Sequence, residues 1–223
     1  MAVKICGLIP SYNEARTIGG IVRELALRGI AAYVIDDGSV DDTASIAASA
    51  GAVVLKHERN KGKGASLREG FKHILKKDFD AVIIMDGDAQ HRPGDIDDFL
   101  KRMEQANADM VIGNRMNDTS SMPIIRIWTN RFMSWLISLV CGQRVPDSQC
   151  GFRLIKKKVL ERVELRSSNY EIESEMIIGA ARAGFKIESV PIKTVYQNEA
   201  SRINPFADTI RFLAFIVRAA FER

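Results

Sequence analysis

Short apolar stretches alternate with helical patterns along the first half of the chain. The apolar stretches are rich in β-branched residues and are bounded by turn residues, which is typical of β-strands. This pattern predicts strands at Val3–Ile9, Ala31–Ile35, Ala52–Leu55, Ala81–Met85 and Asp109–Ile112.

The segments between these strands carry apolar residues three or four positions apart, which is the spacing of one face of a helix. This spacing predicts helices at Ala15–Arg28, Asp42–Ala50, Ala65–Lys76 and Gly94–Gln105. Because near-continuous apolar strands alternate with helices, we expect an α/β fold whose mostly parallel sheet is covered by helices on both faces.

In folds of this kind, ligands bind at the carboxyl ends of the strands. Four predicted strands are followed there by polar or glycine-rich segments: Pro10–Glu14, Asp36–Ser39, Asn60–Gly64 and Asp86–His91. We therefore expect these four segments to meet at one edge of the sheet.

The second half of the chain is less regular. Residues Phe132–Cys141 are nearly all apolar, but this stretch is shorter than the roughly 20 residues that span a bilayer. The stretch Phe206–Phe221 reads as an amphipathic helix with Asp208, Arg211 and Arg218 on one stripe. We expect one domain over residues 1–203, followed by this helix at 204–223, which either packs on the domain or lies in a membrane interface.

Composition narrows the classes of protein. The 223 residues carry a net charge of +4, which fits a phosphate-bearing partner, while no arginine-rich tract interleaved with aromatics points to nucleic acid. The three cysteines have no C-x-x-C spacing, which argues against a zinc site or a disulfide framework and favours a cytoplasmic protein. The N-terminus lacks the pattern of a signal segment.

Two carboxylates, Asp86 and Asp88, directly follow the strand Ala81–Met85. Like charges held this close are costly unless a cation offsets them, and Mg²⁺ and Mn²⁺ prefer oxygen ligands. A polar turn with a helix cap is the simpler interpretation. Phosphatases with an aspartate nucleophile also carry D-x-D, but after their first strand and with Thr or Val next. Here the motif follows the fourth predicted strand and is followed by Ala, Gln and His.

The other loops at this edge lack the usual phosphate-binding motifs. No G-x-G-x-x-G follows the first strand, where Tyr12 and Glu14 instead suit stacking on a base and accepting hydrogen bonds. Of Asp36 and Asp37, one carboxylate could be structural and the other could accept from a base N–H. In the third loop, Lys63 is followed by Gly64 rather than Ser or Thr, so the P-loop pattern fails.

Taken together, these segments resemble a known family. The chain contains, in order, P-S-Y-N-E, V-I-D-D-G-S, N-K-G-K-G-A, M-D-G-D-A-Q-H, G-N-R and S-Q-C-G-F-R. This series resembles the dolichol-phosphate mannose synthase branch of family 2 glycosyltransferases, from about Val3 to about Arg202. The resemblance implies the Rossmann-like GT-A fold and transfer of a sugar, with inversion, from a nucleotide diphosphate donor. GDP-mannose is the first expectation for that donor, and a UDP-sugar is the alternative.

The resemblance also implies roles for donor-side residues. Asp86, Asp88 and Gln90 would hold a Mg²⁺ or Mn²⁺ that bridges the donor's phosphates and acts as a Lewis acid. The family often has D-A-D at this point, so Gly87 replaces its alanine. The nucleoside pocket would be lined by Pro10, Tyr12, Glu14 and Asp37, with Asp36 nearby and Lys63 on the side of the base.

The resemblance further places arginines at the acceptor. A lipid monophosphate has a second pKa of about 6, so it needs cations to position it rather than a base to deprotonate it. The Q-x-x-R-W sequence of hydroxyl-elongating relatives is absent, because Gln149 is followed by Cys, Gly, Phe and Arg. A polyprenyl phosphate is therefore the expected acceptor, contacted by Arg115, Arg131, Arg153 and Arg202.

Two alternatives stay open. A hydroxyl acceptor would need Asp147 or Glu173 as general base. A non-enzymatic nucleotide-sugar binding protein would have little need of arginines on the acceptor side. In the leading interpretation the enzyme is peripheral on the cytoplasmic face of a membrane, and its oligomeric state is open.

Overall fold

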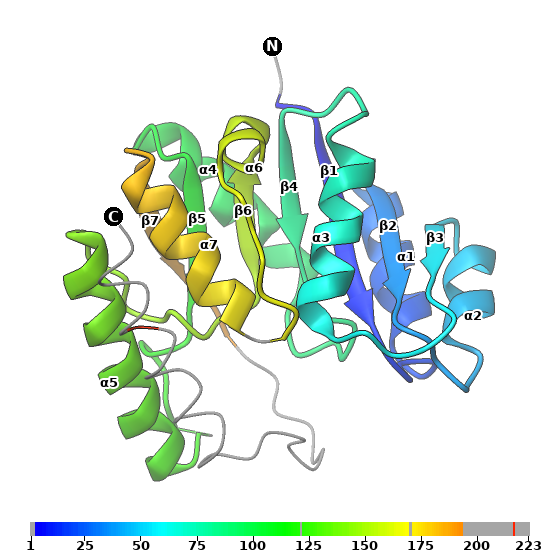
Figure 1. The fold of residues 1–223 in the computed structure, drawn as a ribbon. Helices are drawn as coiled ribbons and strands as arrows, with labels where there is room; N and C mark the ends of the chain where they lie inside the picture. Colours follow the sequence, from blue (N-terminus) through cyan, green and yellow to red (C-terminus); the bar gives the residue numbers. More distant parts are fainter. Residues whose placement is uncertain (1–2, 121, 170, 194–215, 217–223) are drawn as a thin grey trace.

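One seven-stranded sheet with helices on both faces forms the body of the molecule (Figure 1). The computed structural model describes residues 3–120, 122–169, 171–193 and 216. The strands are β1 (Ile5–Ser11), β2 (Ala31–Asp36), β3 (Val53–Lys56), β4 (Ala81–Ile84), β5 (Met110–Asn114), β6 (Arg153–Lys156) and β7 (Ile187–Pro191). The helices are α1 (Ile18–Leu27), α2 (Thr43–Ser49), α3 (Lys63–Ile74), the 3₁₀ turn η1 (Pro93–Asp95), α4 (Ile96–Gln105), α5 (Ile124–Cys141), α6 (Lys157–Arg162) and α7 (Glu171–Arg182).

The strands lie in the order β3-β2-β1-β4-β6-β5-β7. All neighbouring pairs are parallel except those of β6, which runs antiparallel to both β4 and β5. Figure 1 shows α3 and α7 over one face of the sheet, with α1 and α4 behind it and α5 packed outside α7. The expected mostly parallel α/β sheet is confirmed.

Burial follows the position of each strand in the sheet. Strands β1 and β4 lie at its centre and are buried along their whole length, because helices cover both of their faces. Strand β3 lies at the edge and is only partly buried. The core contains Leu8, Ile83 and Phe152, none of which has solvent-exposed surface.

All nine strands and helices expected in the first half are present, with ends shifted by a few residues. Helix α5 was not predicted as an element. It ends at Gly142, whose φ of 62° is the left-handed conformation that glycine supplies at helix ends. Of the amphipathic helix expected at 204–223, only Ile216 lies within the described residues, where it is helical and buried. No helix in the described part of the chain is long and apolar enough to cross a bilayer.

Candidate active site

The four segments expected at one edge of the sheet meet there. The backbone N–H of Asn13, in the first loop, donates to Ser39 Oγ in the second loop at 2.9 Å. Thr17 Oγ1, at the end of the first loop, donates to the carbonyl oxygen of Gly87 in the fourth loop at 2.5 Å. The carboxyl ends of the parallel strands thus bring together residues that lie far apart in the sequence, as predicted.

Asp37 organises the third loop. Its carboxylate accepts the backbone N–H groups of Lys61 and Gly62, each at 2.8 Å, and lies 2.7 Å from Nδ1 of His57. Gly62 has a φ of 93°, which a side chain would strain. The other ring nitrogen of His57 lies 2.8 Å from a carboxylate oxygen of Glu69. The buried histidine therefore links Asp37 to Glu69 and holds the Asp37 side chain in place. Sequence reasoning missed His57, because a single histidine after a strand carries no pattern of its own.

Asp36 is fully buried at the end of β2. Its Oδ1 accepts the backbone N–H of Ser39 at 3.0 Å, and its Oδ2 lies 3.7 Å from the ammonium of Lys56. Asp36 therefore closes the turn after β2. Asp36 thus contacts its own turn and Lys56, whereas Asp37 contacts the loop after β3, and contact of either acid with a nucleoside stays a prediction.

The first loop packs directly on Gly87. A Cβ at this position would lie 2.6 Å from Ser11 Oγ and 3.2 Å from Glu14 Cγ, so the alanine common in the family would clash here. Pro10 is buried within β1, and Tyr12 and Glu14 follow it half-buried. Glycine between the two acids thus lets the predicted nucleoside side approach the predicted metal side.

Lys63 joins two acids from opposite sides of the site. Its ammonium lies 2.5 Å from Asp86 and 2.7 Å from Glu173 on α7. Burial would lower the pKa of Lys63, but the two carboxylates outweigh it and hold that pKa well above its ordinary value. Burial likewise opposes ionisation of Asp86, and Lys63 outweighs it, so the pKa of Asp86 is lowered. Lys63 was expected on the side of the base, yet its ammonium contacts the predicted metal ligand.

Gly151 closes this cluster from the side of β6. A Cβ there would lie 2.7 Å from Asp86 Oδ2 and 3.0 Å from Lys63 Nζ. No side chain fits between the backbone of this segment and the acids. The S-Q-C-G-F-R segment therefore reaches Asp86 through its glycine.

The residues predicted to hold a metal fit a hard cation in part. Asp88 is half-buried and its Oδ1 accepts the backbone N–H of Gln90 at 3.0 Å. Among residues 3–120, 122–169, 171–193 and 216, no group of three His, Cys, Asp or Glu side chains is arranged to hold an ion. Two carboxylates and an amide suit Mg²⁺ or Mn²⁺ that completes its coordination with phosphate oxygens and water. The donor set thus fits a cation that binds together with a phosphate.

His91 connects the acidic loop to the S-Q-C-G-F-R segment. Its ring stacks on Phe152 with centroids 5.1 Å apart, and Nε2 lies 4.0 Å from the sulfur of Cys150. Burial lowers the pKa of His91 to about 4, despite the nearby charge of Asp86, so the imidazole is neutral at neutral pH.

Arg115 is held by Asp147. The guanidinium makes two bonds to the carboxylate, from Nε at 2.7 Å and from Nη2 at 2.9 Å, and the backbone N–H of Arg115 adds a third at 3.0 Å. The amide of Asn130 on α5 donates to the same carboxylate at 2.8 Å. Burial would raise the pKa of Asp147, but these donors lower it. Asp147 is therefore poorly placed to act as a general base, and it positions Arg115 instead.

Arg153 differs from its predicted role. Its side chain is 1% exposed, and its three nitrogens donate to the carbonyl oxygens of Ser148, Cys150 and Glu173 at 2.6–2.8 Å. Because all these donors face backbone carbonyls inside the protein, Arg153 fastens the segment to α7 and is not directed at an acceptor phosphate. Arg131 is exposed on α5, and Arg202 lies outside the described residues.

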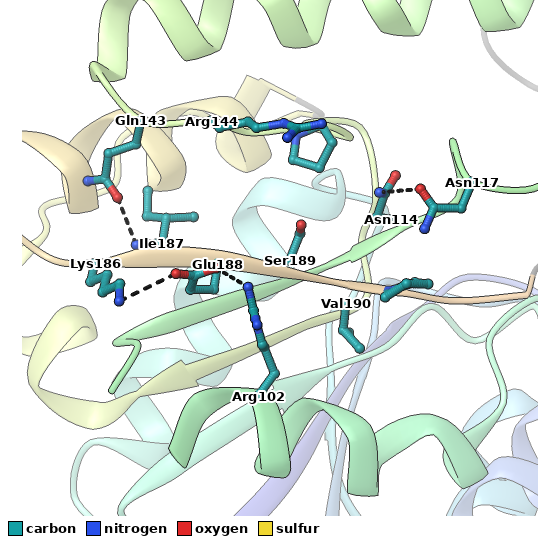
Figure 2. Close-up of a pocket in the computed structure, with 12 residues that line it drawn as sticks. Arg102, Asn114, Asn117, Gln143, Arg144, Lys186, Ile187, Glu188, Ser189 and Val190 are labelled. Atoms are coloured by element: carbon teal, nitrogen blue, oxygen red, sulfur yellow. Dashed lines mark hydrogen bonds and ion pairs between the residues drawn. The ribbon is translucent and has the colours of Figure 1, made fainter. Parts of the chain in front are cut away.

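A separate cavity of about 620 Å³ lies along β7, at the far edge of the sheet (Figure 2). Asn114 at the end of β5 lies at one end of it, next to Arg115, but none of the predicted site residues lines it. The lining includes Arg102, Arg144, Lys186, Glu188 and Ser189.

Gln143 caps the outer edge of β7 beside this cavity. Its Nε2 donates to the carbonyl oxygen of Phe185 at 2.8 Å, and its Oε1 accepts the N–H of Ile187 at 2.9 Å, as the dashed line in Figure 2 marks. A side-chain amide thus makes the two bonds that a neighbouring strand would make.

The sheet order, with an acidic pair after a central strand and the loops gathered around it, is that of the GT-A fold. The chain belongs to glycosyl transferase family 2, whose family model matches residues 7–164.

Named relatives extend this finding. The chain is 31% identical over 212 residues to a UDP-N-acetylglucosamine–dolichyl-phosphate N-acetylglucosaminyltransferase of Methanococcus voltae, covering 85% of this chain and 84% of the relative. It is 28% identical over 199 residues to a polyprenol monophosphomannose synthase of Mycolicibacterium smegmatis, covering 83% of this chain and 75% of the relative.

Solved structures share the fold. Glucosyl-3-phosphoglycerate synthase of Mycobacterium tuberculosis, solved with Mn²⁺, uridine diphosphate and phosphoglyceric acid, superposes with a TM-score of 0.75. That match covers 99% of this chain and 79% of the other at 17% identity, which supports the GT-A architecture alone.

Proposed function

We propose that this glycosyltransferase transfers a sugar from a nucleotide diphosphate to a polyprenyl phosphate, with inversion. The observation that carries the proposal is the position of Asp86. It lies in one cluster with Lys63, from the loop that Asp37 organises, and with Glu173, and Gly151 of the S-Q-C-G-F-R segment packs against that cluster. Predicted donor and acceptor segments therefore meet at the same carboxylate.

Asp86, Asp88 and Gln90 would hold the Mg²⁺ or Mn²⁺ of this reaction. When bound, the ion supplies positive charge that stabilises the departing nucleoside diphosphate. The ammonium of Lys63 lies 2.5 Å from Asp86, and the ion would compete with it for this carboxylate.

The acceptor chemistry needs no base. A phosphate oxygen of the lipid attacks the anomeric carbon, its new C–O bond forms as the bond to the diphosphate breaks, and no proton has to leave the nucleophile. Arg115, whose orientation Asp147 fixes, would hold that phosphate.

A hydroxyl acceptor is less well supported. Both acids that would serve as its base are committed, Asp147 to Arg115 and Asn130, and Glu173 to Lys63. The lowered pKa of Asp147 makes this carboxylate a weak base.

The donor is either GDP-mannose or a UDP-sugar. Of the two relatives, one is named for UDP-N-acetylglucosamine and the other for phosphomannose, and both are named for a polyprenol or dolichol acceptor. A lipid acceptor also places the enzyme at the cytoplasmic face of a membrane in our proposal.

The test begins with thermal stabilisation of the full chain by a panel of GDP- and UDP-sugars, with and without Mn²⁺. The sugar that stabilises most is then incubated with a short polyprenyl phosphate and, in parallel, with a polyprenol. We expect a polyprenyl-phosphate sugar from the phosphate and none from the alcohol. Transfer to the alcohol, or none to either from any donor, would contradict the proposal.

A further inference from the structure

Helix α5 exposes a continuous apolar stripe. Trp128 is 67% exposed and Trp135 is 56% exposed, although large aromatic side chains are usually well buried. The other exposed apolar residues of α5 fall at the same helical spacing as the tryptophans, three or four positions apart in most cases. We define the outer stripe as Ile124, Ile125, Trp128, Phe132, Trp135 and Leu139.

The segment that carries the outer stripe has charge of one sign. From Met122 to Pro146 the chain contains three arginines and no acidic residue. Arg131 is exposed on α5 between Trp128 and Trp135. An apolar face with tryptophans and with basic residues alone matches the boundary between headgroups and acyl chains of an anionic bilayer.

The opposite face of α5 is tied to the active site. Asn130 and Ser134 are buried there, and Ser134 Oγ accepts the backbone N–H of Ser148 at 2.9 Å. Asn130 donates to Asp147, the acid that holds Arg115. One helix therefore exposes an apolar stripe to solvent and places Asn130 and Ser134 against the segment that approaches Asp86.

We propose that the outer stripe of α5 is the surface by which this enzyme docks on anionic membranes. Docked in this way, α5 holds the Asp147–Gly151 segment at a fixed depth beneath the lipid surface, where a membrane-embedded phosphate can reach Arg115. The docking surface rests on the proposed function for its purpose, but its binding to lipid can be measured without any sugar transfer.

The chain offers a direct optical probe. Its two tryptophans, Trp128 and Trp135, both lie on the outer stripe. Vesicles of phosphatidylglycerol and phosphatidylcholine in equal amounts should shift the tryptophan emission of the full chain to shorter wavelength, and brominated lipids should quench it. Salt should weaken the effect. Vesicle binding with unchanged emission would overturn the proposal, and so would an absence of binding.

Substitution tests the same surface by sedimentation with vesicles. We expect the double variant Trp128→Gln/Trp135→Gln to lower partitioning at least about tenfold, because it removes the largest apolar area of the stripe. The matched control is Leu27→Gln/Val40→Gln. It removes two apolar side chains, each 88% exposed, from the end of α1 and from the loop after β2. Equal losses in both variants would overturn the assignment to α5.

A second copy of the chain is the competing occupant. If the stripe joined two copies, the emission maximum without lipid would depend on protein concentration, and Trp128→Gln/Trp135→Gln would turn a dimer into a monomer. Either result would overturn the membrane assignment.

Sugar transfer to a short polyprenyl phosphate in solution separates the two proposals. Transfer without vesicle binding refutes the docking surface alone. Vesicle binding through the stripe, without transfer from any nucleotide sugar, refutes the proposed function alone.

Discussion

Two ion-pair clusters flank the candidate site, and they differ in exposure and in the number of partners. In the first, Lys63 bridges Asp86 and Glu173, and the Asp86 side chain is 27% exposed. In the second, Arg115 binds Asp147, whose side chain is fully buried and also holds an amide of α5. Both clusters pair a cation with a carboxylate whose pKa is lowered.

Because of this difference in exposure, the Lys63–Asp86 pair can be replaced, whereas the Arg115–Asp147 pair is fixed. A lysine ammonium is a single point charge at a partly open acid, so another cation can take its place at Asp86. The two-pronged contact of Arg115 with Asp147 is geometrically specific and buried, and losing either partner leaves an uncompensated charge. The first cluster is suited to ligand binding and the second to positioning.

The strongest test of the replaceable side is Asp88→Asn. Asparagine keeps the shape but removes the charge that would bind the metal, so we expect sugar transfer with Mn²⁺ to fall about a thousandfold. Initial rates over a range of Mn²⁺ concentrations measure the effect. Turnover that survives with the same metal dependence would show that the metal assignment is wrong.

The fixed side is tested by Asp147→Asn. We expect this variant to lose about 3 kcal/mol of unfolding free energy, because it weakens the buried pair with Arg115 and disturbs the bond from Asn130. Urea denaturation measures the loss. Asp78→Asn is the matched control, since it removes an exposed carboxylate paired with Lys4 and should leave stability unchanged. An Asp147→Asn variant as stable as the native chain would contradict the assignment of Asp147 to a fixed, buried pair.

Lys63→Met tests whether the lysine competes with a metal ion for Asp86. Without the ammonium at Asp86, Mn²⁺ should bind the nucleotide-free protein about tenfold more tightly, equivalent to roughly 1.4 kcal/mol. Titration calorimetry measures the affinity. Lys61→Met removes the same charge from the same loop but from an exposed side chain, and should change affinity little. Weaker binding in Lys63→Met would mean that the lysine builds the site rather than competing with the ion.

The smallest expected effect is on acid stability. Because the folded-state pKa of Asp147 is lowered, its stabilisation is present above the unfolded value of about 3.9 and is lost as pH falls through the folded value. The unfolding free energy of Asp147→Asn should therefore decline less steeply than that of the native chain below about pH 4. Urea midpoints across this range measure the slopes, and parallel slopes would contradict the assignment.

The sequence predicted the features that depend on local pattern. The strand Ala81–Met85 is apolar throughout, so the place of Asp86 after a buried strand followed directly. The meeting of the four loops followed as well, because parallel strands end at one edge of the sheet.

Long-range packing decided what the sequence could not show. Arg153 reads like any arginine in a phosphate-binding segment, and only the fold shows that carbonyl oxygens surround it. The bracing of Asp37 by His57 joins two loops that no motif connects. Helix α5 escaped prediction because its apolar residues lie on both its buried and its solvent-facing sides, which blurs the helical periodicity.

The amide of Gln143 has a consequence for the behaviour of the protein in concentrated solution. An uncapped edge strand is a template on which further chains can add, strand upon strand, into aggregates. The side chain of Gln143 occupies the outward-facing carbonyl of Phe185 and the outward-facing N–H of Ile187, so neither group is available to pair with another strand. The start of β7 is thereby protected against edge-to-edge pairing with a strand of another chain.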